Sequence, residues 1–148
     1  MVSIVGFLKN NKNKRMTIKS WAYAAFYRFQ IAFFSRKRLE KHWGVLGEET
    51  DMRIKPWQVR YARWVSQNVN RVCEHTPWES KCLVRALTAR KLLLEKGISC
   101  TLYLGVGKDE KGAMIAHAWI RTGPYYVTGG NGEEFATVAT FKNEGKPI

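Results

Sequence analysis

The 148-residue sequence predicts an α+β fold in which N-terminal helices are followed by an antiparallel sheet. Two observations predict it. Apolar residues recur at helical spacing as far as residue 96, and from residue 99 onward short β-prone segments alternate with glycine-rich turns. Strands that follow the helices, instead of alternating with them, are typical of this class. A hydrophobic content of 45% supports one modest core and therefore one domain.

Three helices are expected before the strands. The first spans residues 17–43, which contain neither proline nor glycine, and its apolar residues are numerous enough to bury a wide face or to pack on a partner. Residues 44–55 are interpreted as a connector. The second helix starts at Pro56, which suits a first turn, and ends just before Pro77. The third runs from about Ser80 to Lys96, because Gly97 is a good stop signal.

Four strands are expected after the third helix, because the apolar period changes there from helical to strand-like. Their boundaries are marked by glycine-containing turns. The four segments are Ser99–Val106, Ala113–Arg121, Tyr125–Thr128 and Glu134–Lys142.

The charge balance is strongly basic, with 25 Lys and Arg against 12 Asp and Glu, a net charge of +13. Such a charge is compatible with nucleic-acid binding, with docking on an anionic membrane or acidic peptide, or with an ordinary solvated surface. The sequence contains no helix-turn-helix, zinc-finger or RNA-recognition signature, so no nucleic-acid partner is expected. The basic, aromatic first helix allows weak contact with an anionic membrane, although ordinary packing is favoured.

A cytoplasmic location is expected from the cysteine content and the N-terminus. Three cysteines are too few for a disulfide framework, and the first residues lack the order of a signal peptide. The longest apolar stretch, residues 21–34, contains Arg28 and is too short to span a membrane.

Cys82 is the candidate nucleophile, because it falls in the first turn of the third helix. Unpaired backbone N–H groups and the positive end of the helix dipole favour a thiolate there, and the same N–H groups can hold an oxyanion. Lys81 adds a positive charge next to it. A buried structural cysteine is the common alternative. Cys73, late in a helix, and Cys100, at the start of a strand, are interpreted as packing residues.

His117 is the candidate base and is expected in the middle of the second strand. A lone histidine on an apolar strand face is more often structural than catalytic. If the sheet packs on the third helix, however, a histidine at this place can meet a cysteine at the start of that helix. Its imidazole would take the thiol proton and later protonate the leaving amine.

A third group usually orients such a base. The following strand is expected to pass His117 near residue 128, where the sequence contains neither Asp nor Glu. Thr128 is the nearest hydrogen-bonding side chain and Asn131 follows in the glycine loop, so both are candidates for the orienting position. Glu133 and Glu134 lie further along the chain.

No metal ion or other cofactor is expected. The three histidines do not form a Cys/His cluster with metal-ligand spacing. The two glycine-rich segments, 105–108 and 129–132, do not have the spacing of a phosphate-binding loop and are interpreted as turns.

A larger ordered set of residues carries a family resemblance. The set comprises Trp78, Cys82-Leu-Val, Ala86-Leu87, Leu93-Leu94, Gly97, Leu104-Gly105-Val106 and Ala116-His117-Ala118-Trp119. In this order they resemble the lasso-peptide B proteins, which are leader peptidases related to the microcin-J-processing protein. These belong to the transglutaminase-like cysteine peptidase superfamily. The resemblance covers about residues 56–142 and implies a transglutaminase-like, papain-like core.

The resemblance implies a function in the biosynthesis of ribosomally made, modified peptides. A hydrolase of this family cuts a lasso precursor between leader and core, with Cys82 as nucleophile and His117 as base. Trp78 and Trp119, from the same motifs, are expected to contact the substrate. Residues 56–148 would form the peptidase core and residues 1–55 a basic helical region, together in one compact unit.

Three partners are implied by the resemblance: the leader peptide of the precursor, the lasso cyclase, and a separate leader-recognition protein of the winged-helix type. The separate protein is expected because residues 1–50 do not have the strand-rich pattern of a built-in recognition domain. One difference from the family is the missing acidic residue after His117. It motivates an alternative, in which the chain is a catalytically impaired scaffold or binding module for the cyclase and precursor.

Overall fold

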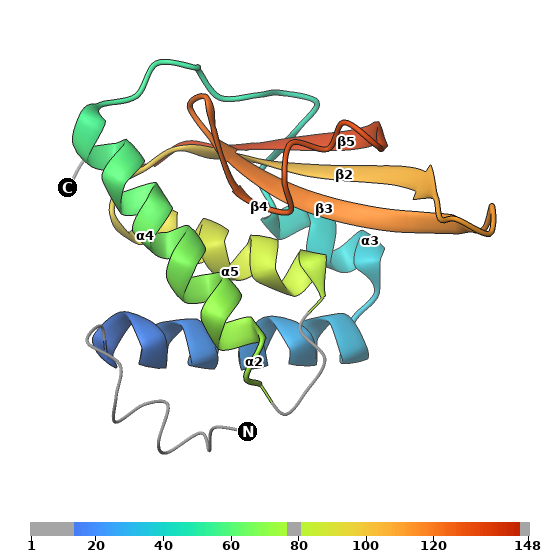
Figure 1. Ribbon diagram of the computed structural model, residues 1–148, viewed down its shortest axis with the longest axis horizontal. Coiled ribbons are helices and arrows are strands. Elements are labelled where there is room, and N and C mark those ends of the chain that lie inside the picture. Colours follow the sequence, from blue (N-terminus) through green and yellow to red (C-terminus); the bar gives the residue numbers. More distant parts are fainter. Residues whose placement is uncertain (1–13, 77–80, 146–148) are drawn as a thin grey trace.

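The computed structural model of the chain describes residues 14–76 and 81–145, and it confirms the α+β class. A five-stranded sheet lies on one side of the molecule and the helices lie on the other (Figure 1). None of the helices in the described ranges combines the length and hydropathy that a membrane span requires.

Two long helices follow the connector. Helix α4 spans Pro56–Cys73 and helix α5 spans Cys82–Glu95. Helix α4 begins as predicted, because Pro56 occupies its first turn and the backbone N–H of Lys55 donates to Oε1 of Gln58 across 3.0 Å. Helix α5 ends as predicted at Gly97, where the backbone N–H of Ile98 closes the helix by donating to the carbonyl of Leu93.

The predicted first helix is wrong in its length. Residues 17–43 contain helix α2 (Lys14–Phe33), a short helix α3 (Arg36–Leu39) and a 3₁₀ turn η1 (Glu40–His42). The break has a side-chain cause: Ser35 adopts an extended conformation, and its hydroxyl oxygen accepts a hydrogen bond from the backbone N–H of Arg38 across 3.4 Å. A serine cap therefore starts a new helix without any proline or glycine.

Helix α2 packs across α4 and α5 (Figure 1). The side chains that face them are mostly small or polar, including Thr17, Ser20 and Ala24, and these allow close approach. The Tyr23 hydroxyl donates to Oε2 of Glu95 on α5 across 2.6 Å. Phe29 and Phe33 lie on the exposed side of α2, so its apolar residues do not bury a wide face within the chain, and packing on a partner stays a prediction.

The sheet contains the four predicted strands and one that was not predicted. The strands are β1 (Val45–Leu46), β2 (Cys100–Lys108), β3 (Met114–Thr122), β4 (Tyr125–Thr128) and β5 (Ala136–Asn143). They lie in the order β1-β5-β2-β3-β4, and each neighbouring pair is antiparallel. The unpredicted β1 lies in the expected connector 44–55, where it pairs with the outer edge of β5.

The two faces of the sheet differ in composition. Side chains alternate between faces along a strand. On one face, Leu102, Leu104, Ala118 and Ile120 belong to the aliphatic core that the sheet shares with the helices. His117, two residues before Trp119 on β3, lies on the other face.

Candidate active site

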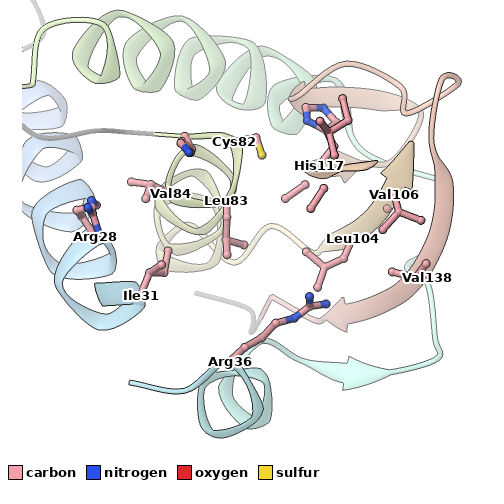
Figure 2. A pocket seen from close by; sticks show the side chains of 15 residues that line it. Arg28, Ile31, Arg36, Cys82, Leu83, Val84, Leu104, Val106, His117 and Val138 are labelled. Atoms are coloured by element: carbon pink, nitrogen blue, oxygen red, sulfur yellow. The ribbon is translucent and has the colours of Figure 1, made fainter. Parts of the chain in front are cut away.

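A cavity of about 550 Å³ lies between the start of α5, the strands β2 and β3, and the helices α2 and α3 (Figure 2). Both Cys82 and His117 line it. Its volume is in the range of about 300–1,000 Å³ that small-molecule and cofactor sites occupy. We refer to this space as the Cys82 cavity.

Cys82 is the first residue of α5 and is partly exposed. Lys81 precedes it in an extended conformation, and the first intrahelical bond runs from the N–H of Arg85 to the carbonyl of Lys81. The backbone N–H groups of the first turn therefore have no partner within the helix, and such groups can bind a ligand. Figure 2 shows the sulfur directed into the cavity, toward the side on which His117 lies.

The other two cysteines have a different environment. Cys73 at the end of α4 and Cys100 at the start of β2 are free and buried. Burial raises the pKa of the Cys100 thiol to about 12, so this thiol stays protonated and unreactive near neutral pH. Among the three, only Cys82 lines the cavity.

His117 is held by a backbone carbonyl. Its Nε2 lies 2.7 Å from the carbonyl oxygen of Gly129. A carbonyl oxygen can only accept, so Nε2 carries the proton in this hydrogen bond. In the neutral ring Nδ1 then keeps its lone pair and is the basic nitrogen.

Aromatic stacking fixes the plane of the same ring. Phe135 stacks on His117, with ring centroids 4.5 Å apart and an angle of 21° between the planes. Trp119 lies next to His117 on the same face, at 5.8 Å, and stacks on Tyr103 at 5.4 Å. The imidazole is thus one member of a row of four aromatic rings, and its rotation is restricted by packing as well as by the bond to Gly129.

The loop that supplies the Gly129 carbonyl depends on glycine. Gly129 and Gly132 have φ angles of +76° and +71°, a region that other residues rarely adopt. A Cβ atom on Gly129 would lie 2.8 Å from Cβ of Trp119, and one on Gly132 would collide with the Trp119 ring. These glycines let the loop wrap closely around Trp119, and this path brings the carbonyl to His117.

A polar network supports the far end of the aromatic row. The Tyr103 hydroxyl donates to Oε1 of Glu49 and accepts from Nε of Arg121, which is 2.8 Å away. The buried Arg121 guanidinium also donates to the carbonyls of Thr50 and Gly123, at 3.0 and 2.6 Å. Burial, followed by the hydrogen bond to Glu49, raises the pKa of Tyr103. The hydroxyl therefore keeps its proton, and its hydrogen bond to Glu49, to a higher pH than a free tyrosine would.

Cys82 begins a helix that packs on one face of the sheet, whereas His117 lies on the other face. Both can line one cavity because part of the edge of β3 is free. Strand β4 pairs with β3 only at Ile120, Arg121 and Thr122. On that side residues 114–119 have no strand partner among the described residues, so the His117 ring is accessible around the sheet edge. Within the described residues no hydrogen bond joins the thiol to the imidazole, and such contacts often form only when substrate is bound.

The structure does not bring the two predicted orienting side chains to His117. The Thr128 hydroxyl is buried and has no hydrogen-bond partner among the described residues. The Asn131 side chain accepts from the backbone N–H of Glu133 across 3.1 Å, which stabilises the loop itself. The orienting contact comes instead from the backbone between them, at Gly129.

The structure bears on one of the two predicted substrate contacts. Trp78 lies outside the described residues. Trp119 is 2% exposed and does not line the Cys82 cavity, because its ring packs behind His117 and under the glycine loop. In this structure the Trp119 ring packs beside the imidazole of His117.

Other site residues were not predicted. Arg28 on α2 and Arg36 at the start of α3 line the Cys82 cavity, and Phe135 stacks on His117. Nothing in their local sequence indicates a site, since they come near Cys82 only through tertiary packing. The arrangement has the parts that acyl transfer needs: a thiol, a basic nitrogen, unpaired N–H donors and a cavity for the acyl group.

Comparison with known proteins gives one family match. The family model described as Transglutaminase-like superfamily matches residues 24–140. This range contains both Cys82 and His117 and begins within helix α2. None of the curated proteins and none of the solved structures matches the chain.

Proposed function

Because the chain belongs to the transglutaminase-like superfamily, we propose that it is a cysteine peptidase that removes the leader from a lasso-peptide precursor. One observation carries the proposal: Cys82, at the start of α5, and the oriented His117 line the same cavity. The choice of a lasso precursor rests on the resemblance of the motifs around these two residues to the lasso B proteins.

In the proposed reaction Nδ1 of His117 takes the proton from the Cys82 thiol as the sulfur attacks the carbonyl carbon of the leader–core bond. The carbon–sulfur bond forms, and the N–H groups of the first turn of α5 hold the oxyanion. The carbon–nitrogen bond then breaks, and the imidazolium gives its proton to the amine of the core. Water, deprotonated by the same imidazole, hydrolyses the acyl-enzyme and releases the leader as a carboxylate.

The hydrogen bond from Nε2 to Gly129 supports this assignment. As the imidazole becomes an imidazolium, the carbonyl oxygen remains a suitable acceptor, and the stacked Phe135 ring offers its negative face to the cation. The carbonyl bears a partial charge, whereas the acidic group of the family pattern bears a full one. We therefore expect a weaker stabilisation of the imidazolium than an Asp would give.

We propose the exposed side of α2 as the docking surface for a separate leader-recognition protein. Ile18, Phe26, Phe29 and Phe33 lie on this side at intervals of three to eight residues, and each is more than half exposed. Helix α2 contains no acidic residue. Aromatic residues flanked by cations are typical of protein interfaces, and the expected partner surface is apolar with an acidic rim.

The main test is a cleavage assay with the cognate precursor and the recognition protein, followed by mass spectrometry. We expect the wild type to separate leader from core. We expect Cys82→Ala and His117→Ala to reduce the rate by about 10³-fold or more, as when members of a catalytic unit are removed. His42→Ala, which changes an exposed histidine outside the cavity, is the matched control and should cleave at the wild-type rate.

Two outcomes would contradict the proposal. Normal cleavage by Cys82→Ala would exclude this residue as nucleophile. If no form cleaves the precursor but the wild type still binds it, the chain would instead be a scaffold. The docking surface is tested with Phe29→Ser/Phe33→Ser, which should weaken binding of the recognition protein and leave alkylation of Cys82 unchanged. Equal binding by this variant, or loss of binding to anionic vesicles instead, would contradict the docking proposal.

A further inference from the structure

The charges around the Cys82 cavity are all of one sign. Arg28, Arg36 and Lys81 line it, and no Asp or Glu is among the described residues of its lining. Cationic walls around a partly enclosed space raise the local concentration of anionic ligands. The chain as a whole has a net charge of +13, but here the cations surround the candidate nucleophile.

Arg28 is the least compensated of these cations. It projects from α2 and is half-buried. Its guanidinium makes no hydrogen bond or ion pair with another described residue. In Figure 2 it lies at the α2 side of the cavity, beside Ile31 and away from His117. A half-buried guanidinium without a carboxylate partner is well suited to receive one from a ligand.

Arg36 is held in place by one edge of its guanidinium. Its Nε donates to Oε1 of Glu40 across 2.7 Å. Its two terminal amino groups make no hydrogen bond to another described residue, and Figure 2 shows the side chain extending toward Leu104 on the cavity floor. The ion pair thus fixes the side chain while leaving two donors available in a fork that matches a carboxylate.

An apolar floor separates these arginines from the reacting groups. Leu83 and Leu104 lie between the Arg36 guanidinium and the end of the cavity at Cys82 and His117, and Val84 lies between Arg28 and Cys82 (Figure 2). A peptide whose scissile carbonyl is at Cys82 would place an apolar side chain on this floor. A carboxylate side chain further along the peptide would then reach one of the two arginines.

We propose that Arg28 and Arg36, at two separate places on the cavity wall, each offer a guanidinium to a carboxylate side chain of the peptide substrate, near the cleaved bond but separated from it by an apolar residue. This inference rests on the proposed peptidase function and names the substrate class of the same cavity: an apolar peptide with an Asp or Glu side chain beside the cleavage site. It also gives the N-terminal helices a role in selecting the substrate.

The test measures binding and cleavage separately. Fluorescent peptides carrying Glu or Gln, in matched pairs at successive positions on each side of the cleavage site, are titrated against Cys82→Ala by anisotropy. At one or two positions we expect the Glu peptide to bind about three- to tenfold more tightly, as for a charge-assisted hydrogen bond at a half-buried site. Raising the salt concentration should reduce this preference.

Variants of the two arginines test whether these residues cause the preference for the Glu peptide. In the Cys82→Ala background, adding Arg28→Gln and Arg36→Gln together should bring the Glu and Gln peptides to equal affinity. Arg28→Lys should keep part of the difference, and Arg63→Gln, on an exposed part of α4, should keep all of it. For active enzyme the same substitutions should raise KM for the Glu peptide and leave kcat unchanged.

The inference is overturned if Glu and Gln peptides bind equally at every position, or if the preference survives in the double arginine variant. Binding to Cys82→Ala does not depend on catalysis. A failure of the peptidase proposal, with no cleavage of any peptide, is therefore distinguishable from a failure of the carboxylate subsite.

Discussion

Cys82 and Cys100 each begin an element of secondary structure, yet their environments are opposite. Cys82 begins a helix, is partly exposed and lines a cavity with a histidine. Cys100 begins a strand, is fully buried and pairs in the ladder with Asn143. A helix start leaves N–H groups unpaired, whereas a strand start inside a sheet does not. The comparison indicates that the first position of a helix favours a reactive thiol, whereas the first position of a strand does not.

Thiol alkylation tests this difference between the cysteines most directly. With iodoacetamide near neutral pH we expect Cys82 to react about a hundredfold or more faster than Cys73 and Cys100, because buried thiols react only when the structure opens. Mass spectrometry of a proteolytic digest measures each site. In denaturant all three should react at similar rates. Similar rates in the folded protein would mean that the contrast in burial has no chemical consequence.

A second prediction concerns stability in alkaline solution. Burial raises the pKa of Cys100 to about 12 from its ordinary value of 9.0, so between these values the unfolded chain loses this proton and the folded chain keeps it. The stabilisation is fully present below pH 9.0 and is lost as the pH rises toward 12. By about pH 11 the loss should be on the order of 2 kcal/mol.

Urea denaturation at a series of pH values measures this loss. Tyr23, whose pKa is raised to about 12, and Tyr27 add to it in the same direction. In Cys100→Ala the free energy of unfolding should therefore fall less steeply with pH above 9.0, but it should still fall. Cys82→Ala is the matched control and should change the slope less, because Cys82 is partly exposed and Cys100 is buried. An equal effect of both substitutions would remove the distinction between the two thiols.

The smallest expected effect concerns the base that serves Cys82. Phe135→Ala removes the ring stacked on His117, and we expect kcat/KM to fall about three- to tenfold, the scale of an aromatic pair. Phe135→Tyr should restore the rate because it keeps the ring. Phe33→Ala, on the exposed side of α2, is the control and should not affect cleavage of a short peptide. A Tyr variant as slow as the Ala variant would argue against stacking as the cause.

Much of this fold follows from sequence patterns. The order of helices and strands, the start of α4 at Pro56 and the end of α5 at Gly97 are local signals that were interpreted correctly. The break at Ser35 and the two-residue strand β1 were not predicted. A single capping serine competes weakly with a long helical pattern, and a strand of two residues has no pattern of its own.

The site was predictable only in part. Cys82 and His117 stand out because their residue types and positions indicate a chemistry. The group that holds His117 is a backbone carbonyl, and its position depends on the path of a glycine loop around Trp119. Every residue has such a carbonyl, so no residue type marks it. Arg28 belongs to the cavity only because α2 packs across α5, a contact that local sequence does not reveal.

The position of β5 in the sheet has a consequence for biosynthesis. Although it is the last strand along the chain, it lies between β1 and β2. The side chain of Asn143 in this strand donates to the carbonyl of Trp43, a hundred residues earlier, across 2.8 Å. Until residues 136–143 have left the ribosome, β2 exposes an unpaired edge and β1 has nothing to pair with. The nascent chain can form its helices and the β2-β3-β4 part of the sheet early, but β1 can join the sheet only after β5 has been made.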